Sequence, residues 1–140
     1  MGGVARMKRV FKSPTTVNLV ITDVCNASCT HCLNYWRDDD SRKIQLDRNK
    51  MEIIVDKLSK AGVFHVVLSG GEPFANFDVL EYGFKLLKEK NISISCNSNL
   101  MLATADKLAR LRDVGVDHIL TSLMSYKPEI VNSAFNMPNA

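Results

Sequence analysis

The chain has 140 residues, of which 46% are hydrophobic and 24% are charged, and its formal net charge is +3 at pH 7. This is the size and composition of a single globular domain with a buried core. The small net charge gives no reason to expect a nucleic acid or an anionic membrane as a partner. No apolar run reaches the roughly 18 residues of a membrane span. The basic first residues lack the apolar segment of a secretory signal, so we expect a cytoplasmic protein whose four cysteines are ligands or reduced thiols.

The first half of the chain predicts a strand, a polar loop and a helix. Residues 16–22 (TVNLVIT) are rich in β-branched side chains and predict a strand. Residues 34–43 are polar, and we expect a solvated surface loop there, with a cation site on the three consecutive aspartates as the alternative. Residues 46–61 carry apolar side chains at helical spacing. Asp47 is a suitable N-cap for this helix, and Gly62 a suitable residue to end it.

The second half continues the alternation of strands and helices. The predicted strands are 63–69, 91–96 and 116–123, and the predicted helices are 78–90 and 104–114, the last ended by Gly115. Pro128 is suited to the first turn of another helix. We expect that helix to be incomplete, because the chain ends at Ala140. Helices between successive strands predict an α/β fold with a parallel sheet and right-handed crossovers.

The unusual residues all follow predicted strands. Cys25, Cys29 and Cys32 (CNASCTHC) follow the first strand, and the turn GGEP at 70–73 follows the second. The segment 96–99 follows the third strand, and Ser122 ends the fourth. Because ligands bind at the carboxyl ends of parallel strands, the sequence predicts one site at this edge of the sheet.

Three thiols in one short loop predict a metal centre. Thiolates prefer soft or borderline metals, chiefly zinc, copper(I) and iron–sulfur clusters. A cubane [4Fe–4S] cluster is large enough for three cysteines of one loop to hold it, which leaves its fourth iron open to a substrate. A structural zinc site with His31 as a fourth ligand is the alternative. Adjacent residues such as His31 and Cys32 seldom both reach one tetrahedral ion, which favours the cluster.

CNASCTHC and SGGEP together resemble the C-x₃-C-x₂-C and Gly-Gly-Glu motifs of the radical S-adenosylmethionine (SAM) superfamily. The resemblance implies the first three to four units of a partial (β/α)₆ barrel. It also implies a [4Fe–4S] cluster on Cys25, Cys29 and Cys32 whose open iron binds SAM. In that family, one electron cleaves SAM to a 5′-deoxyadenosyl radical, which takes a hydrogen atom from the substrate.

The same resemblance implies roles for residues outside the cysteine motif. The backbone of Gly70, Gly71 and Glu72 would accept from the SAM ammonium group, and Glu72 would add charge or fix the turn. Ser122 would contact the ribose or methionine part, and His31 would pack near the adenine. Asn97 lies where relatives read Thr-Asn-Gly, but Cys96-Asn97-Ser98 departs from that triplet, so its role at the cofactor stays open.

The remaining candidates have simpler interpretations. Cys96 is expected to be a small buried apolar residue, and His65 and His118, inside strands, to be core or partly buried residues. Tyr35 and Trp36 either shelter the cluster or cover the loop, and the sequence does not separate the two.

The resemblance also predicts an incomplete domain. Residues 1–140 are expected to be a single core domain that lacks the C-terminal part of the barrel. The pattern is similar to that of SPASM-type enzymes, which implies a peptide substrate and an electron donor such as flavodoxin or ferredoxin. The alternatives are a radical SAM enzyme of cofactor biosynthesis and a truncated, non-catalytic iron–sulfur or zinc scaffold.

Overall fold

The structure is a computed structural model that describes residues 12–33 and 44–138. Strands and helices alternate along the chain, as the sequence predicts. They are β1 (Thr16–Thr22), α1 (Arg48–Lys60), β2 (His65–Gly70), η2 (Pro73–Asn76), α2 (Phe77–Glu89), β3 (Ser93–Asn97), α3 (Ala105–Val114), β4 (His118–Leu120) and α4 (Pro128–Phe135). The chain therefore has the predicted α/β architecture. The expected acidic loop at 34–43, with Tyr35 and Trp36, lies outside the described residues.

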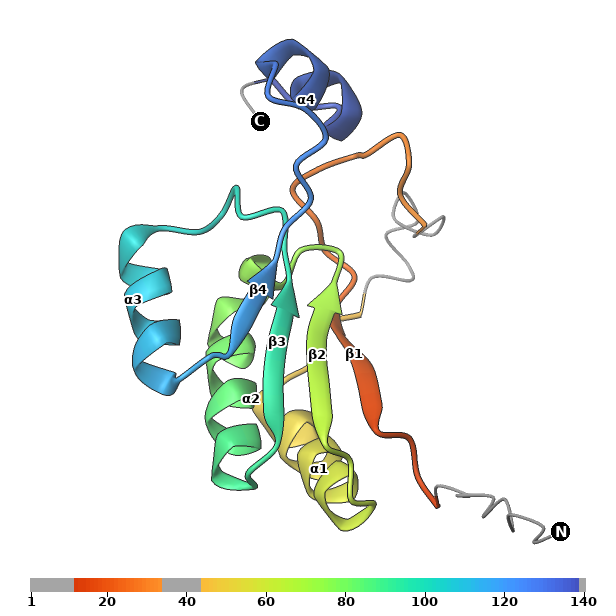
Figure 1. Cartoon of the computed structure of the whole chain (residues 1–140), viewed down its shortest axis with the longest axis vertical. Coiled ribbons are helices and arrows are strands. Elements are labelled where there is room, and N and C mark those ends of the chain that lie inside the picture. Colours follow the sequence, from red (N-terminus) through yellow and green to blue (C-terminus); the bar gives the residue numbers. More distant parts are fainter. Residues whose placement is uncertain (1–11, 34–43, 139–140) are drawn as a thin grey trace, which may run out of the picture.

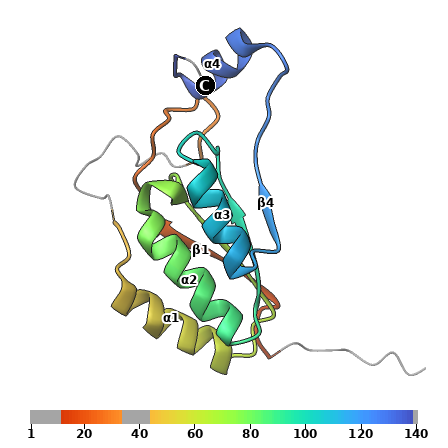
Figure 2. The ribbon, with the colours of Figure 1, turned by 90° about the vertical axis from the view of Figure 1, so that its left-hand side faces the viewer.

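The sheet is parallel and its strands follow the order β1-β2-β3-β4. Because every crossover between neighbouring parallel strands has the same hand, α1, α2 and α3 come to lie on one face of the sheet. Figures 1 and 2 show these helices side by side over that face, whereas α4 stands apart, beyond the carboxyl ends of the strands. The arrangement is that of consecutive βα units of a barrel wall.

The core lies between the sheet and the three helices. Val66 and Leu68 of β2 alternate with residues of the opposite face, and they meet Leu80 and Phe84 of α2 and Ile94 of β3. All five side chains are 0% exposed. Period-two burial in the strands and helical spacing in α2 thus supply one continuous apolar layer.

Helix ends follow the sequence signals. The Asp47 side chain accepts from the Lys50 amide at 2.8 Å, and the Thr104 hydroxyl accepts from the Lys107 amide at 3.2 Å. Gly62 and Gly115 follow their helices with φ of +73° and +84°, a conformation that glycine adopts without the steric cost of a side chain. The predicted N-cap at Asp47 and both glycine stops are confirmed.

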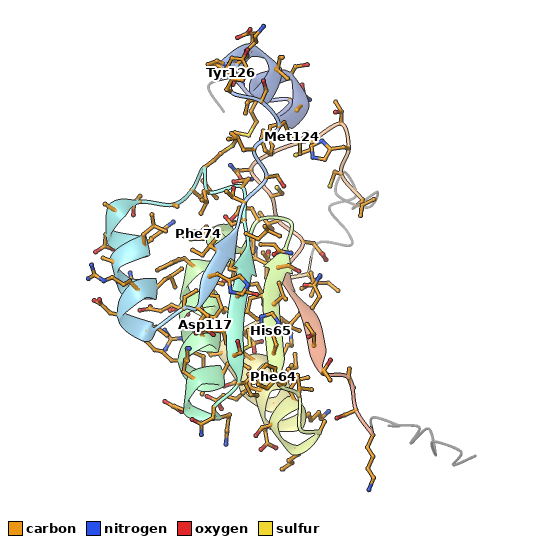
Figure 3. All side chains as sticks on the ribbon, viewed as in Figure 1. Phe64, His65, Phe74, Asp117, Met124 and Tyr126 are labelled. Atoms are coloured by element: carbon orange, nitrogen blue, oxygen red, sulfur yellow. The ribbon has the colours of Figure 1, made fainter. Side chains whose placement is uncertain are left out.

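The other face of the sheet carries polar side chains. Ser69 donates to the Asn18 amide oxygen, and His65 Nε2 lies 2.9 Å from Ser95 Oγ. His65, labelled in Figure 3, is partly buried as expected. His118 is exposed, however, and its ring stacks on His65 at 5.9 Å between centroids. The expectation of a core or partly buried His118 is wrong, because the short edge strand β4 leaves that ring open to solvent.

Two predicted elements differ in extent. The strand expected at 116–123 is only three residues long, His118–Leu120, because it pairs with β3 on one side alone among the described residues. Ser122 therefore lies beyond the strand and not at its end. The helix at Pro128, expected to stay incomplete, forms over eight residues and ends at Asn136, which has φ +51°. No helix within residues 12–33 and 44–138 has the length and apolar composition to cross a membrane.

Candidate functional site

A cleft of about 450 Å³ opens at the carboxyl ends of the strands. Every residue predicted for the site lines this cleft, although these residues come from separate segments of the chain. They are Cys25, Cys29, His31, Cys32, Gly70, Gly71, Glu72, Asn97 and Ser122. Parallel pairing in chain order brings the loops after successive strands to one edge, which is why the sequence could predict the gathering.

The turn after β2 is hydrogen-bonded to the segment that leads into the cysteines. The amide of Gly71 donates to the Thr22 carbonyl at 2.7 Å, and the amide of Glu72 donates to the Val24 carbonyl at 2.8 Å. A Cβ on Gly70 would lie 2.3 Å from Thr22 O, and one on Gly71 would lie 2.5 Å from Val24 O. Both glycines are therefore required by the close approach of two backbones.

The Glu72 carboxylate, only 1% exposed, is satisfied by protein donors. Its Oε1 accepts from the Phe74 amide at 3.0 Å and from the Ser98 hydroxyl at 2.7 Å, and its Oε2 accepts from the Asn99 amide at 2.8 Å. A buried carboxylate needs such partners to offset its lost hydration. Of the two roles expected for Glu72, these contacts are those of a residue that fixes the turn, and they tie it to the loop after β3.

Asn99 extends this connection to the cysteine segment. Its side-chain amide donates to Asn26 Oδ1 at 3.0 Å, and its own Oδ1 accepts from the Met101 amide at 3.0 Å. One residue thus contacts both the Gly-Gly-Glu turn and the residue after Cys25. The sequence places Ser98 and Asn99 at this edge but indicates no role for them, because its only signal there is a polar run at a strand end.

The cysteine segment makes its own local contacts. The Ala27 amide lies 3.4 Å from Cys25 Sγ, and the Cys32 amide donates to the Cys29 carbonyl at 3.2 Å. Burial raises the pKa of the Cys25 thiol, the Ala27 amide opposes that shift, and the nearby charge of Glu72 adds to it. Amide donors to cysteine sulfur are a feature that tunes iron–sulfur centres, so this environment fits a thiolate-bound cluster.

The three cysteines suit a cluster in type and in access. Cys25 and Cys29 are partly buried and Cys32 is exposed, and all three thiols are unbridged. Among residues 12–33 and 44–138, no group of three or more His, Cys, Asp or Glu residues is arranged to hold a single metal ion. Cys96 is separate from this set: it is 0% exposed, it does not line the cleft, and burial raises its pKa to about 12. The prediction of a buried apolar Cys96 is confirmed.

The more peripheral candidates lie at the cleft but are exposed. Asn97 ends β3, Ser122 follows β4, and both are exposed. His31 is exposed too, and its ring meets the Phe135 ring edge-on, with 6.3 Å between centroids and 68° between planes. Phe135 was not predicted for the site, because it belongs to a helix that we expected to be incomplete.

The sequence profile of the radical SAM superfamily matches residues 19–139. The chain therefore belongs to this superfamily, whose members in general use a [4Fe–4S] cluster and SAM.

Several known proteins are similar to the chain. The PqqA peptide cyclase of Bradyrhizobium diazoefficiens is 28% identical over 130 residues, which are 93% of this chain and 34% of that protein. The probable GTP 3′,8-cyclase of Methanocaldococcus jannaschii is 30% identical over 117 residues, 82% of this chain and 38% of that protein. The structure of SuiB from Streptococcus suis bound to its precursor peptide SuiA matches with a TM-score of 0.76 at 20% identity. That match covers 90% of this chain and 28% of SuiB.

These comparisons confirm the family and the fold predicted from the sequence. The chain spans about a third of the length of the curated relatives that it matches.

Proposed function

We propose that the chain is the cofactor-binding part of a radical SAM enzyme. One observation carries the proposal: the three cysteines, the Gly-Gly-Glu turn and the other predicted residues, from separate segments of the chain, line one cleft. Membership of the radical SAM superfamily supports the same interpretation.

In this proposal Cys25, Cys29 and Cys32 hold the cluster as thiolates. When bound, a [4Fe–4S] cluster with an open iron supplies the electron that cleaves SAM, and the resulting 5′-deoxyadenosyl radical takes a hydrogen atom from the substrate. An electron donor such as flavodoxin or ferredoxin is proposed to provide the reducing electron. The chain itself holds the thiols in place and orients the nucleotide.

The other residues are proposed to orient SAM. The backbone of Gly70, Gly71 and Glu72 is proposed to accept from the SAM ammonium group. The Glu72 carboxylate holds that turn in place through its bonds with Ser98 and Asn99. Ser122 is proposed to contact the ribose or methionine part, and His31 the adenine. Asn97 is proposed to contact the nucleotide from the end of β3.

We propose a peptide as the substrate. The names of two similar proteins support this class, since one is a PqqA peptide cyclase and the other is SuiB bound to its precursor peptide SuiA. The similarity to a probable GTP 3′,8-cyclase supports the second candidate, a small nucleotide substrate in cofactor biosynthesis.

Anaerobic reconstitution with iron and sulfide tests the proposal. We expect about four irons per chain, as a [4Fe–4S] cluster requires, and a change in the electron paramagnetic resonance spectrum of the reduced cluster when SAM is added. Replacement of Cys25, Cys29 or Cys32 by Ala should abolish the cluster.

Cys96→Ala is the matched control, because Cys96 is buried and does not line the cleft. This substitution should leave the iron content unchanged. Zinc at about one ion per chain, with no iron–sulfur absorption, would support a structural scaffold instead. A brown protein whose spectrum ignores SAM would also contradict the proposal.

A further inference from the structure

Helix α4 contacts the cysteine segment through its last turn. The amide of Ser28 donates to the Phe135 carbonyl at 3.2 Å, and the amide of Thr30 donates to the Ala134 carbonyl at 3.1 Å. The last carbonyls of a helix have no partner within the helix, so they are available to accept from another segment. Figures 1 and 2 show α4 directly above this loop, far from the other three helices.

The same contact has an apolar part. Val131, Phe135 and Ala27 are 8%, 4% and 7% exposed, and together they form a small cluster separate from the main core. Cys25 and Cys29 pack against this cluster. Two of the three proposed cluster ligands thus pack against a cluster to which α4 contributes two of the three buried side chains, so displacement of the helix would loosen the support of the loop that carries them.

Phe135 also contacts the side of the cleft where we propose that the adenine binds. Its ring lies edge-on to His31, and both residues line the cleft. An edge-to-face contact restricts the orientation of a ring that is otherwise exposed. Phe135 therefore joins three features: the backbone of the loop, its apolar support and the orientation of His31.

The chain leading into α4 comes from the same cleft. Ser122 lines the cleft, and the five residues 123–127 connect it to the helix. Tyr126 and Met124, labelled in Figure 3, lie on this stretch, and they are 87% and 43% exposed. The position of α4 thus depends on its contact with the cysteine loop more than on packing of the linker, and each segment orders the other.

We propose that α4 is a clamp on the cysteine loop, with Phe135 and Val131 as positioning residues that control cluster retention and SAM affinity. The inference rests on the proposed function for its cofactors, but its backbone part concerns the metal-free chain as well. The clamp holds residues 27–31 in place without touching the reacting atoms.

Hydrogen exchange of the metal-free full chain tests the backbone part. In Phe135→Ala, we expect the amides of Ser28 and Thr30 to exchange about tenfold faster, because local opening governs their protection. Amides of β2 and β3 should keep their protection, which shows that the fold is intact. Ile130→Ala is the matched control: Ile130 lies on the same helix, is 47% exposed and does not belong to the small cluster.

Iron release to a chelator and SAM affinity test the cofactor part in the reconstituted chain. Phe135→Ala and Val131→Ala should release iron several-fold faster than wild type, and Ile130→Ala should not. Phe135→Leu keeps apolar bulk without the ring, so it should retain loop protection but bind SAM several-fold more weakly.

The outcomes separate the two proposals. Unchanged exchange at Ser28 and Thr30 in Phe135→Ala and in Val131→Ala would overturn the clamp, even if wild type binds a cluster and SAM. Faster exchange with unchanged iron release would overturn the part of the proposal in which α4 controls cluster retention. Failure of wild type to bind any cluster would defeat the proposed function, and the exchange result alone would then decide whether α4 holds the loop. If Phe135→Ala does not fold, Val131→Ala and Phe135→Leu decide the same question.

Discussion

The chain has two apolar clusters that differ in how they are built. The main core lies between the sheet and α1, α2 and α3, and regular elements supply its fully buried side chains. The small cluster joins Ala27 of the cysteine segment to Val131 and Phe135 of α4. The first follows from periodic patterns, and the second from a loop and a helix that meet at the carboxyl end of the sheet. Stability and site geometry are thus supported by different parts of the molecule.

The largest effect on stability is expected in the main core. Phe84 is 0% exposed, and Phe84→Ala should lower the free energy of unfolding by about 3–5 kcal/mol through lost burial and a cavity. Urea denaturation measures the loss. Phe135→Ala should cost less globally, because its cluster has few buried members. Equal losses in the two variants would mean that both clusters unfold as one unit and that the comparison fails.

The next largest effect is expected at the turn that joins the fold to the site. The Cβ of Gly71→Ala would meet Val24 O and Asp23 O at 2.5 and 2.7 Å, so we expect a loss of about 1–3 kcal/mol and weaker SAM binding. Denaturation and a SAM titration measure the two effects. Gly62→Ala is the control, since its Cβ has nothing within 4 Å but its φ is +73°. It should lower stability and leave SAM affinity unchanged.

Glu72→Gln tests the polar part of the site. The glutamine side chain keeps one oxygen acceptor, but its NH₂ group points at N–H or O–H donors that now bond to the second carboxylate oxygen. Leaving a buried polar group unpaired in this way costs about 1–3 kcal/mol. We expect faster hydrogen exchange at Asn99 and at Asn26, which Asn99 contacts. Glu89→Gln, at an exposed position, is the matched control and should change neither. Normal protection at Asn99 in Glu72→Gln would show that the carboxylate does not hold the loop.

The smallest effect is expected at Asp117, at the opposite end of the sheet from the cleft. Bonds from the Lys88 ammonium and the Ile94 amide lower the pKa of Asp117 to about 2. Because this pKa is below the unfolded value of about 3.9, the carboxylate stabilises the fold above about pH 4, and this stability is lost as the pH falls toward 2. Asp117→Asn should cost about 1 kcal/mol at pH 7, since the partly exposed pair is screened by solvent.

Denaturation from pH 7 to pH 2 checks the sign. The difference in the free energy of unfolding between wild type and Asp117→Asn should shrink as the pH falls. At neutral pH, the loops that line the metal-free cleft should show the same hydrogen exchange in Asp117→Asn as in wild type. A difference that grows toward low pH would contradict the assignment.

Much of the fold could be predicted because its signals are local. Asp47 caps α1 where the sequence indicates, β1 has the predicted bounds, and Gly115 ends α3. Strand β4 was overestimated because the β-branched Thr121 and the apolar Leu123 follow Leu120, although among the described residues only β3 pairs with β4. The length of a strand depends on its partners, which the local sequence does not contain.

The site was predictable where chemistry and topology coincide, and not where side chains meet at long range. Thiol spacing and the glycine turn place the predicted residues at one edge, and the structure brings all of them to one cleft. Two of the three partners of Glu72, Ser98 and Asn99, lie 26 and 27 positions away, and the Asn99 contact with Asn26 spans 73. No periodic pattern encodes such pairs, nor the edge-on contact of Phe135 with His31.

The hydrogen bonds of the Gly-Gly-Glu turn have a consequence for rebuilding a lost iron–sulfur cluster. The amides of Gly71 and Glu72, and the carboxylate of Glu72, are anchored to oxygen and nitrogen atoms of the protein, and no sulfur takes part. Oxidative loss of iron would therefore leave the nucleotide side of the cleft assembled. We expect the cluster of such a protein to be reconstituted with iron and sulfide directly, without unfolding of the chain.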